Sequence, residues 1–241
     1  MARVRIVGAG RAGGSFALAL AEVGWVPELV VHGVPLGPAT RDVELVLLCV
    51  PDGSVAEVAA EIVPDERCVV AHCAGSLTLD VLALHPRRAS VHPLVSLPSP
   101  SIGAERLRGA WFGVAGDPLG ARVVSDLGGR AVSPPEEHRG EYHAAAVVAS
   151  NHLVALLGQV ERIAASVGVP LDAYLDLASG SLGNVAELGP AAALTGPVAR
   201  GDWDTVRAHL VALAPDEREA YLALARAAAR LADRDLPGDL G

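Results

Sequence analysis

The sequence predicts an α/β fold, a doubly wound parallel sheet followed by an all-α domain, and three observations support this. Short apolar runs alternate with helical patterns over the first 135 residues, which is typical of a parallel sheet covered by helices on both faces. A glycine-rich turn joins the first run to the first helix. After Pro134 and Pro135 the strand patterns stop and alanine-rich helical patterns continue. We therefore expect domains at residues 1–135 and 136–241.

The elements of the first domain follow from apolar spacing. One run is apolar throughout, as expected of a strand covered on both faces. The expected strands are Val4–Val7, Leu29–Val31, Leu45–Val50, Val69–Ala71, Ala89–Val91 and Trp111–Ala115. Helical spacing predicts helices at Ala12–Val23, Val55–Ile62, Leu77–Leu84 and Gly120–Leu127. Only 11 residues, Val34 to Glu44, join the second and third strands, and a crossover helix hardly fits in that length.

The second half is predicted to be helical throughout. The expected helices are Glu141–Val167, Leu171–Leu177, Val185–Leu188, Thr205–Leu213 and Pro215–Leu231. The last begins with a proline and two acidic residues, which the helix dipole favours at that end. This half is rich in alanine and leucine and too apolar to be wholly solvated. We therefore expect it to form a homodimer.

Composition excludes several classes of function. The formal charge is −9, from 19 basic and 28 acidic residues, whereas nucleic-acid binding requires a basic face. The chain contains no lysine, which excludes Schiff bases, a P-loop lysine and a lysine general acid. Three cysteines, Cys49, Cys68 and Cys73, form neither a disulfide framework nor a metal site.

The sequence also gives an expectation for location. No uninterrupted apolar run reaches the roughly 18 to 20 residues that span a bilayer. The first residues enter a strand pattern and lack a signal-peptide layout. We therefore expect a cytoplasmic protein that does not enter a membrane.

The glycine-rich turn, residues 8–13, fits the pattern G-x-G-x-x-G between a strand and a helix, the context in which the pattern binds a dinucleotide. Its residues are Gly8, Ala9, Gly10, Arg11, Ala12 and Gly13. In such a Rossmann-type turn the first glycine permits the bend, the second admits the pyrophosphate, and the third allows close helix packing. The anion then binds free N–H groups at the helix N-terminus.

The second strand indicates which dinucleotide is bound. An NAD site usually has an acidic residue at the end of that strand, but here it ends in His32 and Gly33. The sequence therefore favours NADP, whose additional phosphate requires a cation. Arg11 and Arg41 are candidates, and either could equally be a solvated surface arginine.

Several segments resemble a family of Rossmann-like proteins, described as oxidoreductases, that carry a C-terminal domain of unknown function 2520. These segments are His72-Cys73-Ala74-Gly75, Val91-His92-Pro93-Leu94, Tyr142-His143-Ala144 through Ser150-Asn151, and residues Leu194 to Asp202. Cys49-Val50-Pro51-Asp52 resembles the wider NADP-dependent clan of ketopantoate reductase, pyrroline-carboxylate reductase and prephenate dehydrogenase. The resemblance implies that Val50, Pro51 and Asp52 contact the cofactor. Ala74 stands where the family leads us to expect serine.

The resemblance and the residue types together nominate catalytic side chains. Related hydroxyacid dehydrogenases place a lysine and then an asparagine on the first long helix of the second domain; Asn151 matches the asparagine, and Val147 occupies the lysine position. Asn151 could polarise a substrate oxygen or simply bond another helix. His92, then His72 and His143, could supply a proton near neutral pH or simply fix a loop.

Three further residues are candidates for binding the substrate. Thr195 and Arg200 could bind a carboxylate, although Thr195-Gly196-Pro197 also fits a helix cap and Arg200 could pair with Asp202. Asn184 is a weaker candidate, expected in a loop.

We expect an NADP-dependent oxidoreductase that reduces a small carbonyl or imine, such as the keto acid ketopantoate. The alternative is a non-catalytic dinucleotide-binding or regulatory protein, which the missing lysine, Ala74 and the short second connection would suit. Fold alone does not decide between them.

Overall fold

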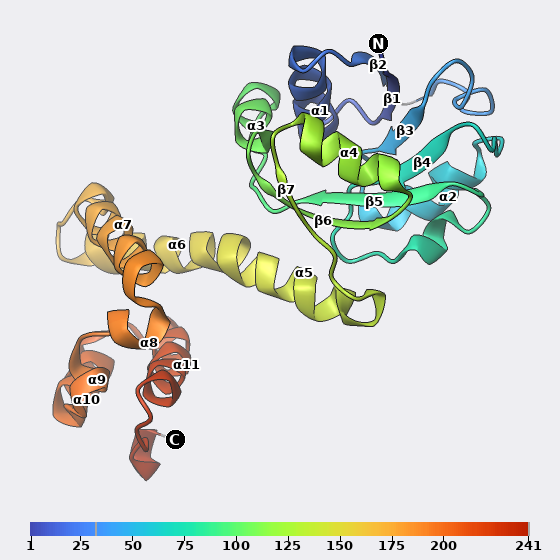
Figure 1. Ribbon diagram of the computed structural model, residues 1–241. Helices are drawn as coiled ribbons and strands as arrows, with labels where there is room; N and C mark the ends of the chain where they lie inside the picture. The colour runs from blue at the N-terminus through green and yellow to red at the C-terminus, as the bar shows by residue number, and fades with distance from the viewer. Residues whose placement is uncertain (32, 241) are drawn as a thin grey trace. The chain divides into compact units, whose positions relative to one another are not determined.

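The computed structural model describes residues 1–31 and 33–240, and the chain divides into two compact units, Met1–Ser150 and Asn151–Gly241. The first unit contains a seven-stranded sheet of order β2-β1-β3-β4-β5-β6-β7 (Figure 1). Its strands are β1 (Arg3–Val7), β2 (Val26–Val30), β3 (Leu45–Leu48), β4 (Val69–His72), β5 (Arg88–Pro93), β6 (Trp111–Gly116) and β7 (Arg130–Val132). This confirms the predicted α/β class.

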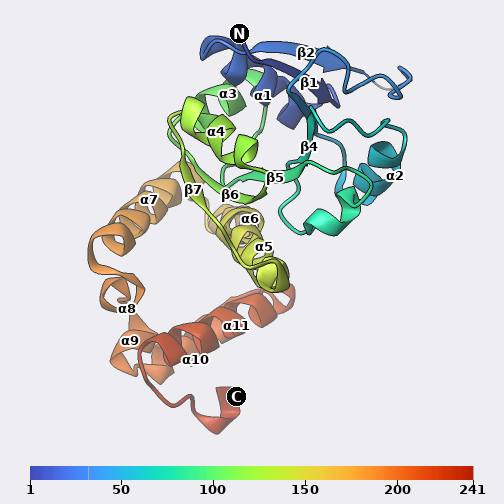
Figure 2. The ribbon, with the colours of Figure 1, turned by 45° about the vertical axis from the view of Figure 1, so that its right-hand side comes forward.

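Helices cover both faces of the sheet. In Figure 2, α1 (Arg11–Glu22), α3 (Pro100–Leu107) and α4 (Pro118–Asp126) lie on one side and α2 (Val55–Ala60) on the other. Alternate strand residues enter two separate cores: Leu45 and Leu47 pack with the α1 side, while Val46 and Leu48 pack with the α2 side. Because both of its faces are buried, β3 is apolar throughout.

The sheet is not wholly parallel, which corrects the prediction. β6 pairs antiparallel with β5, with His92 opposite Gly113, whereas the other pairs are parallel. α3 and β7 were not predicted from the sequence. The helix predicted at Leu77–Leu84 is a short 3-10 turn at Leu79–Leu82.

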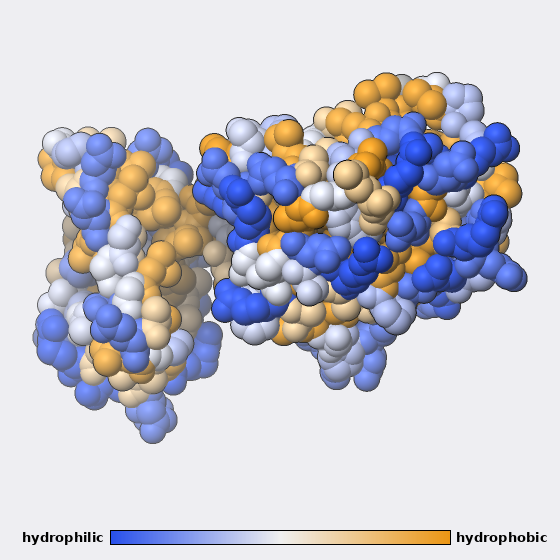
Figure 3. All heavy atoms as spheres, turned by 45° about the horizontal axis from the view of Figure 1, so that its top comes forward, coloured by the Kyte–Doolittle hydropathy of each residue, from blue (hydrophilic) through white to orange (hydrophobic). Residues whose placement is uncertain are grey.

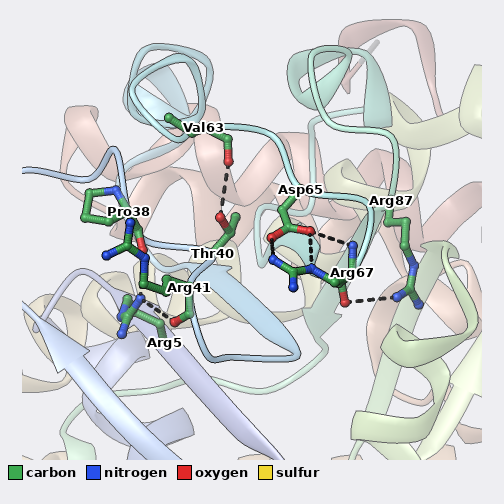
Figure 4. A network of polar contacts seen from close by, with 8 residues as sticks. All are labelled: Arg5, Pro38, Thr40, Arg41, Val63, Asp65, Arg67 and Arg87. Atoms are coloured by element: carbon green, nitrogen blue, oxygen red, sulfur yellow. Dashed lines mark hydrogen bonds and ion pairs between the residues drawn. The ribbon is translucent and has the colours of Figure 1, made fainter.

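The connection between β2 and β3 contains only turns among its described residues, as its length predicted. Arg5 of β1 holds it in place: its guanidinium donates to the carbonyl oxygens of Pro38, Ala39 and Arg41 at 3.2, 2.6 and 3.3 Å. Figure 4 shows this contact beside Thr40, which bonds the Val63 carbonyl at 3.2 Å. One side chain thus fixes a segment that lacks regular structure.

The long helix predicted at Glu141–Val167 is observed in three parts. These are α5 (Arg139–Val147), a π-helical turn (Val148–His152) and α6 (Leu153–Ser166). The division between the two units falls within the π-helical turn, rather than at residue 135 as predicted. The reason is that α5 packs against the sheet of the first unit through Arg139 and Tyr142, as described below.

The second unit is helical, as predicted. It also contains α7 (Leu171–Leu188), α8 (Pro190–Ala193), α9 (Pro197–Arg200), α10 (Trp203–Ala212) and α11 (Pro215–Leu231). The two short helices predicted within residues 171–188 are the single helix α7. The small core of the second unit joins α9, α10 and α11 around Val206 and Ala229. Arg162 of α6 bonds the Glu217 carboxylate at 2.5 Å and so ties α6 to α11.

One helical stretch in the described part of the chain, Glu136–Ser166, has the length and composition to cross a membrane, and 6% of its apolar window is buried within the structure. A single stretch of this kind is weak evidence for a membrane helix. It does show that apolar side chains of α5 and α6 lie at the surface. Figure 3 shows orange apolar residues on the surface of the helical unit.

Candidate functional site

The glycine-rich turn lies at the carboxyl end of β1, where it begins α1. Gly8 has φ +109°, and a Cβ there would collide with the Cys49 carbonyl oxygen. A Cβ on Gly13 would collide with the Gly8 carbonyl, so both positions require glycine to fold. Gly10, in contrast, faces open space within 4 Å. The fold itself therefore does not require a glycine at position 10.

The N-terminus of α1 is available to an anion. Gly10 is its N-cap, no side chain caps it, and no acidic residue lies in its first turn. The free N–H groups and the helix dipole therefore favour a negatively charged ligand at residues 10–13. Arg11, the first residue of the helix, is exposed at this end.

A cavity of about 450 Å³ lies beside Gly8 and between the ends of β2 and β3. Val50 and Pro51, both predicted to contact cofactor, line it, together with Glu57 and Glu61. Two acidic residues and no arginine are among its described lining residues. Arg41 lines a smaller adjacent cavity of about 230 Å³ with Arg5 and does not line the larger one. His32, part of the argument for NADP, lies outside the described residues.

A cluster of polar side chains lies where β4 and β5 meet α5. His92 on β5 has its Nδ1 2.8 Å from the Tyr142 hydroxyl. His143 follows Tyr142 on α5, and its ring centroid lies 6.0 Å from that of His92, at an interplanar angle of 74°. The first unit thus brings together His92 and His143, both predicted from sequence, and adds Tyr142, which was not predicted.

Gly75 makes this cluster possible. A Cβ built on it would lie 2.7 Å from His143 Cδ2 and 2.7 Å from His92 Nε2. Two imidazole rings therefore occupy the space that any other residue would need. This explains a glycine at the end of the motif His72-Cys73-Ala74-Gly75.

Arg139 anchors α5 to the sheet beside these rings. Its side chain is 2% exposed. Its Nε donates to the Leu77 carbonyl at 3.3 Å and its Nη2 to Ser90 Oγ. Glu136, one turn earlier, faces it at 3.9 Å and also accepts from the Leu79 N–H. The guanidinium lies 5.7 Å from the centroid of the Tyr142 ring.

Burial and charge set the ionisation of the histidines. Burial, followed by His143 and Arg139, lowers the pKa of His92 to about 4. Burial and Arg139 also lower the pKa of His72. The pKa of His92 thus lies well below neutral pH, and the pKa of His72 is shifted in the same direction. His72 is completely buried, so it packs behind the cluster.

Asp52 reaches the same edge of the sheet from the turn after β3. It accepts a hydrogen bond from Ser76 Oγ at 2.7 Å. Ser76 lies two residues after Ala74, the position where the family led us to expect a serine hydroxyl. The residues that follow β3 and β4 are thus joined by a polar contact that the sequence analysis did not identify.

The remaining predicted residues belong to the second unit. Asn151 lies in the π-helical turn, a type of irregularity that is frequent at functional sites. Asn184 lies within α7 rather than in a loop. Thr195 and Arg200 are exposed beside and within α9.

Two details of the segment around α9 differ from the prediction. The N-cap of α9 is Gly196, with no side-chain cap, so Thr195 does not cap the helix. Asp202 caps α10 by accepting from the N–H and hydroxyl of Thr205 at 3.2 and 2.7 Å. Asp202 was considered as an ion-pair partner of Arg200, and the structure shows it as the cap of α10.

Comparison with known proteins confirms the resemblance and the fold. Residues 113–228 match the model of a domain of unknown function, DUF2520. A structure described as a "putative NADP oxidoreductase" from Bacteroides fragilis is 21% identical over 95% of this chain and 98% of its own, with a TM-score of 0.78. Protein TM1727 from Thermotoga maritima is 25% identical over 95% and 98%, with a TM-score of 0.72.

A third similar structure is 1-pyrroline-5-carboxylate reductase from Streptococcus pyogenes, 16% identical over 95% of this chain and 98% of its own, with a TM-score of 0.64. No curated protein matches the chain. The similarity therefore covers both units, and at these identities it establishes the fold.

We predict that Gly75→Ala disturbs the histidine cluster. The added methyl group must displace at least one imidazole, which typically costs about 1 to 3 kcal/mol of unfolding free energy. Urea unfolding measures this cost, and the imidazole NMR signals of His92 and His143 should move.

The matched control is Gly140→Ala on α5, where a Cβ meets no atom within 4 Å and alanine is favoured in a helix. Unchanged stability and histidine signals in Gly75→Ala would show that the rings do not pack on Gly75 as described.

Proposed function

We propose that the protein binds a nicotinamide dinucleotide and reduces a small carbonyl or imine compound, such as a 2-oxo acid of the ketopantoate type. The observation that carries this proposal is the shared position of two features. The uncapped N-terminus of α1 and the His92 cluster both lie at the carboxyl ends of parallel strands of one sheet, where doubly wound proteins bind ligands.

The residues of this edge fit a dinucleotide. The N–H groups at the start of α1 would hold the pyrophosphate, and Gly10 leaves room for it. Val50 and Pro51 line the cavity of about 450 Å³ that would receive the nucleoside next to Gly8. When bound, the nicotinamide supplies a hydride, and the protein's part is to orient it and the substrate.

Similar proteins support this class of reaction. The Bacteroides fragilis structure is described as an NADP oxidoreductase, and the Streptococcus pyogenes protein is a pyrroline-carboxylate reductase. Both share this fold along nearly the whole chain. Asn151, Thr195 and Arg200, with Asn184 as a weaker candidate, are the residues proposed to bind the substrate.

NADP is the proposed form of the cofactor. β2 ends at Val30 and is followed by Val31, so neither of these positions carries a carboxylate. The exposed Arg11 at the glycine turn can pair with a 2′-phosphate. Glu57 and Glu61 oppose a phosphate from the cavity wall. The preference for NADP therefore depends on Arg11 outweighing these two carboxylates.

We predict that Gly10→Val lowers NADPH affinity at least about tenfold, or roughly 1.4 kcal/mol. Its side chain would occupy the space through which the pyrophosphate approaches. Fluorescence titration of the full chain measures the dissociation constant.

Because a Cβ at this position meets no neighbouring atom, the variant should fold, and a thermal melt checks this. A folded Gly10→Val protein that binds NADPH normally would contradict the assignment of the glycine turn. The control is Gly140→Ala on α5, another glycine whose Cβ meets open space.

We predict that NADPH binds more tightly than NADH, and that Glu57→Gln increases this preference. Removing a negative charge from the cavity wall favours the more negatively charged dinucleotide. Arg11→Gln should have the opposite effect. Equal affinities for the two dinucleotides in the wild type, measured by calorimetry at fixed ionic strength, would overturn the NADP assignment.

We also propose that a second copy of the chain covers the helical unit. α7 contains 18 residues and none is buried. Leu171, Leu175, Ala178, Leu182 and Val185 recur at alternating spacings of four and three, the pattern of a helix that packs along another helix.

Lipid is a less suitable cover for the adjoining apolar stretch at residues 136–166. Its first turns are bound to the sheet through the buried Arg139 and through Tyr142. A helix fixed in this way to a water-exposed domain cannot place those turns inside a bilayer.

We predict that Leu182→Glu, at a side chain 57% exposed in the single chain, converts the dimer to a monomer in light scattering at micromolar concentration. A charge buried without a partner at a helix interface is strongly unfavourable. The control is Leu84→Glu, at a residue 65% exposed in the first unit, which should remain dimeric. A monomeric wild type would refute the proposed dimer.

A further inference from the structure

We infer that His92 acts on the substrate as a hydrogen-bond donor through its Nε2–H, and that Tyr142 is the positioning residue that fixes this tautomer. The inference rests on the proposed reductase function and assigns His92 a different role from proton donation.

The position of the Tyr142 hydroxyl determines where the His92 proton lies. The hydroxyl oxygen lies 2.8 Å from His92 Nδ1. It also lies against Gly113 of β6, where a Cβ would collide with it. Among the described residues, the hydroxyl proton of Tyr142 has no acceptor other than His92 Nδ1. A neutral imidazole nitrogen accepts a proton more readily than a phenol oxygen, so the hydroxyl donates to Nδ1. A neutral imidazole whose Nδ1 accepts carries its proton on Nε2.

The other side of the ring leaves Nε2 free for a ligand. Nε2 lies next to Gly75, and the nearest part of His143 to that glycine is carbon Cδ2. Among the described residues, His92 has a hydrogen bond only through Nδ1. A substrate carbonyl oxygen that reaches Nε2 would accept a hydrogen bond from Nε2–H.

The charges around His92 keep its ring neutral. His143 and Arg139 on α5 and His72 on β4 oppose a positive charge, as does burial; Asp52, after β3, favours one. The balance puts the pKa at about 4, so the ring becomes charged only as the pH falls through that value. Between pH 5 and 8 the neutral ring can donate a hydrogen bond through its N–H, but it does not readily transfer that proton. A neutral imidazole can nevertheless polarise a carbonyl by hydrogen bonding.

The reduction balances without proton transfer from His92. A nicotinamide held at the glycine turn would supply the hydride and its electron pair to the carbonyl carbon, and negative charge would then develop on the oxygen. Nε2–H stabilises the charge that develops there. The oxygen then takes a proton from water, and His92 finishes the step unchanged.

The first experiment is ¹⁵N NMR of the imidazole nitrogens in the full, ligand-free chain, with His92→Gln to assign the signals. The expected result is a protonated Nε2 and an unprotonated Nδ1 that stay unchanged from pH 8 to pH 5. A proton on Nδ1, or titration of His92 within that range, would overturn the inference.

The second experiment removes the positioning contact. In Tyr142→Phe the signals of His92 should shift toward a mixture of the two tautomers, while Tyr174→Phe on α7 should leave them unchanged. A tautomer that is fixed equally well in Tyr142→Phe would exclude the assigned role of Tyr142. The wild-type spectrum remains decisive for His92 if this variant folds poorly.

The third experiment uses NADPH and a panel of 2-oxo acids. His92→Leu removes the donor and should lower kcat by about 10²- to 10³-fold, as expected for loss of one donor to an oxyanion, and the pH profile should keep its shape. Full turnover in His92→Leu, or loss of a limb near neutral pH, would overturn the inference. If the wild type failed to bind NADPH, the proposed function would fail, and the NMR result would still be readable.

Discussion

The buried guanidinium of Arg139 is the interaction on which the arrangement of the candidate site depends. A charge without water must be paired or hydrogen-bonded, because otherwise its desolvation is prohibitive. Arg139 meets this requirement through the Leu77 carbonyl, Ser90 Oγ and the nearby Glu136. These contacts fix the first turn of α5 on β5. Tyr142 lies one turn later, so the same contacts deliver its hydroxyl to His92.

Arg139 also contributes to the electrostatics of the site. Its charge lowers the pKa of both His72 and His92, so the residue that assembles the cluster also helps to keep it uncharged. Ser90 and His92 lie two residues apart on β5 and therefore face the same side of the sheet. Arg139 and Tyr142, three residues apart on α5, match that spacing. Strand and helix periodicities together bring four polar side chains into one place.

The sequence predicted the sheet well where burial determines the pattern and poorly where it does not. The fully apolar run at Leu45–Leu48 is a central strand, and the glycine turn begins α1. β7 has three residues, all exposed, so no apolar run marks it. The antiparallel direction of β6 was also missed, because an apolar run buried on both faces has the same composition in either direction.

The site was predicted by residue type and missed where it depends on long-range contacts. His92 and His143 were nominated because imidazoles follow predicted strands or lie on the long helix. The bond from Tyr142 to His92 spans 50 positions in the sequence, and no local pattern reports it. The lowered pKa of His92 likewise depends on burial and on charged residues that belong to other elements. Tyr142 could have been nominated from the sequence, because it is a polar aromatic residue within a motif already identified. Its partner, His92, could not be predicted from residue spacing along the chain.

The short connection after β2 has a consequence for solubility. Without a further strand beyond it, β2 is the edge of the sheet, and an open edge can recruit strands from other molecules. β2 carries Pro27, which has no N–H to offer a neighbouring strand, and Glu28, whose carboxylate is held by Arg5 at 2.6 Å. The residue that fastens the connection thus also orders the charge on the open edge. The β2 edge of the sheet is in this way protected from pairing with a strand of another molecule.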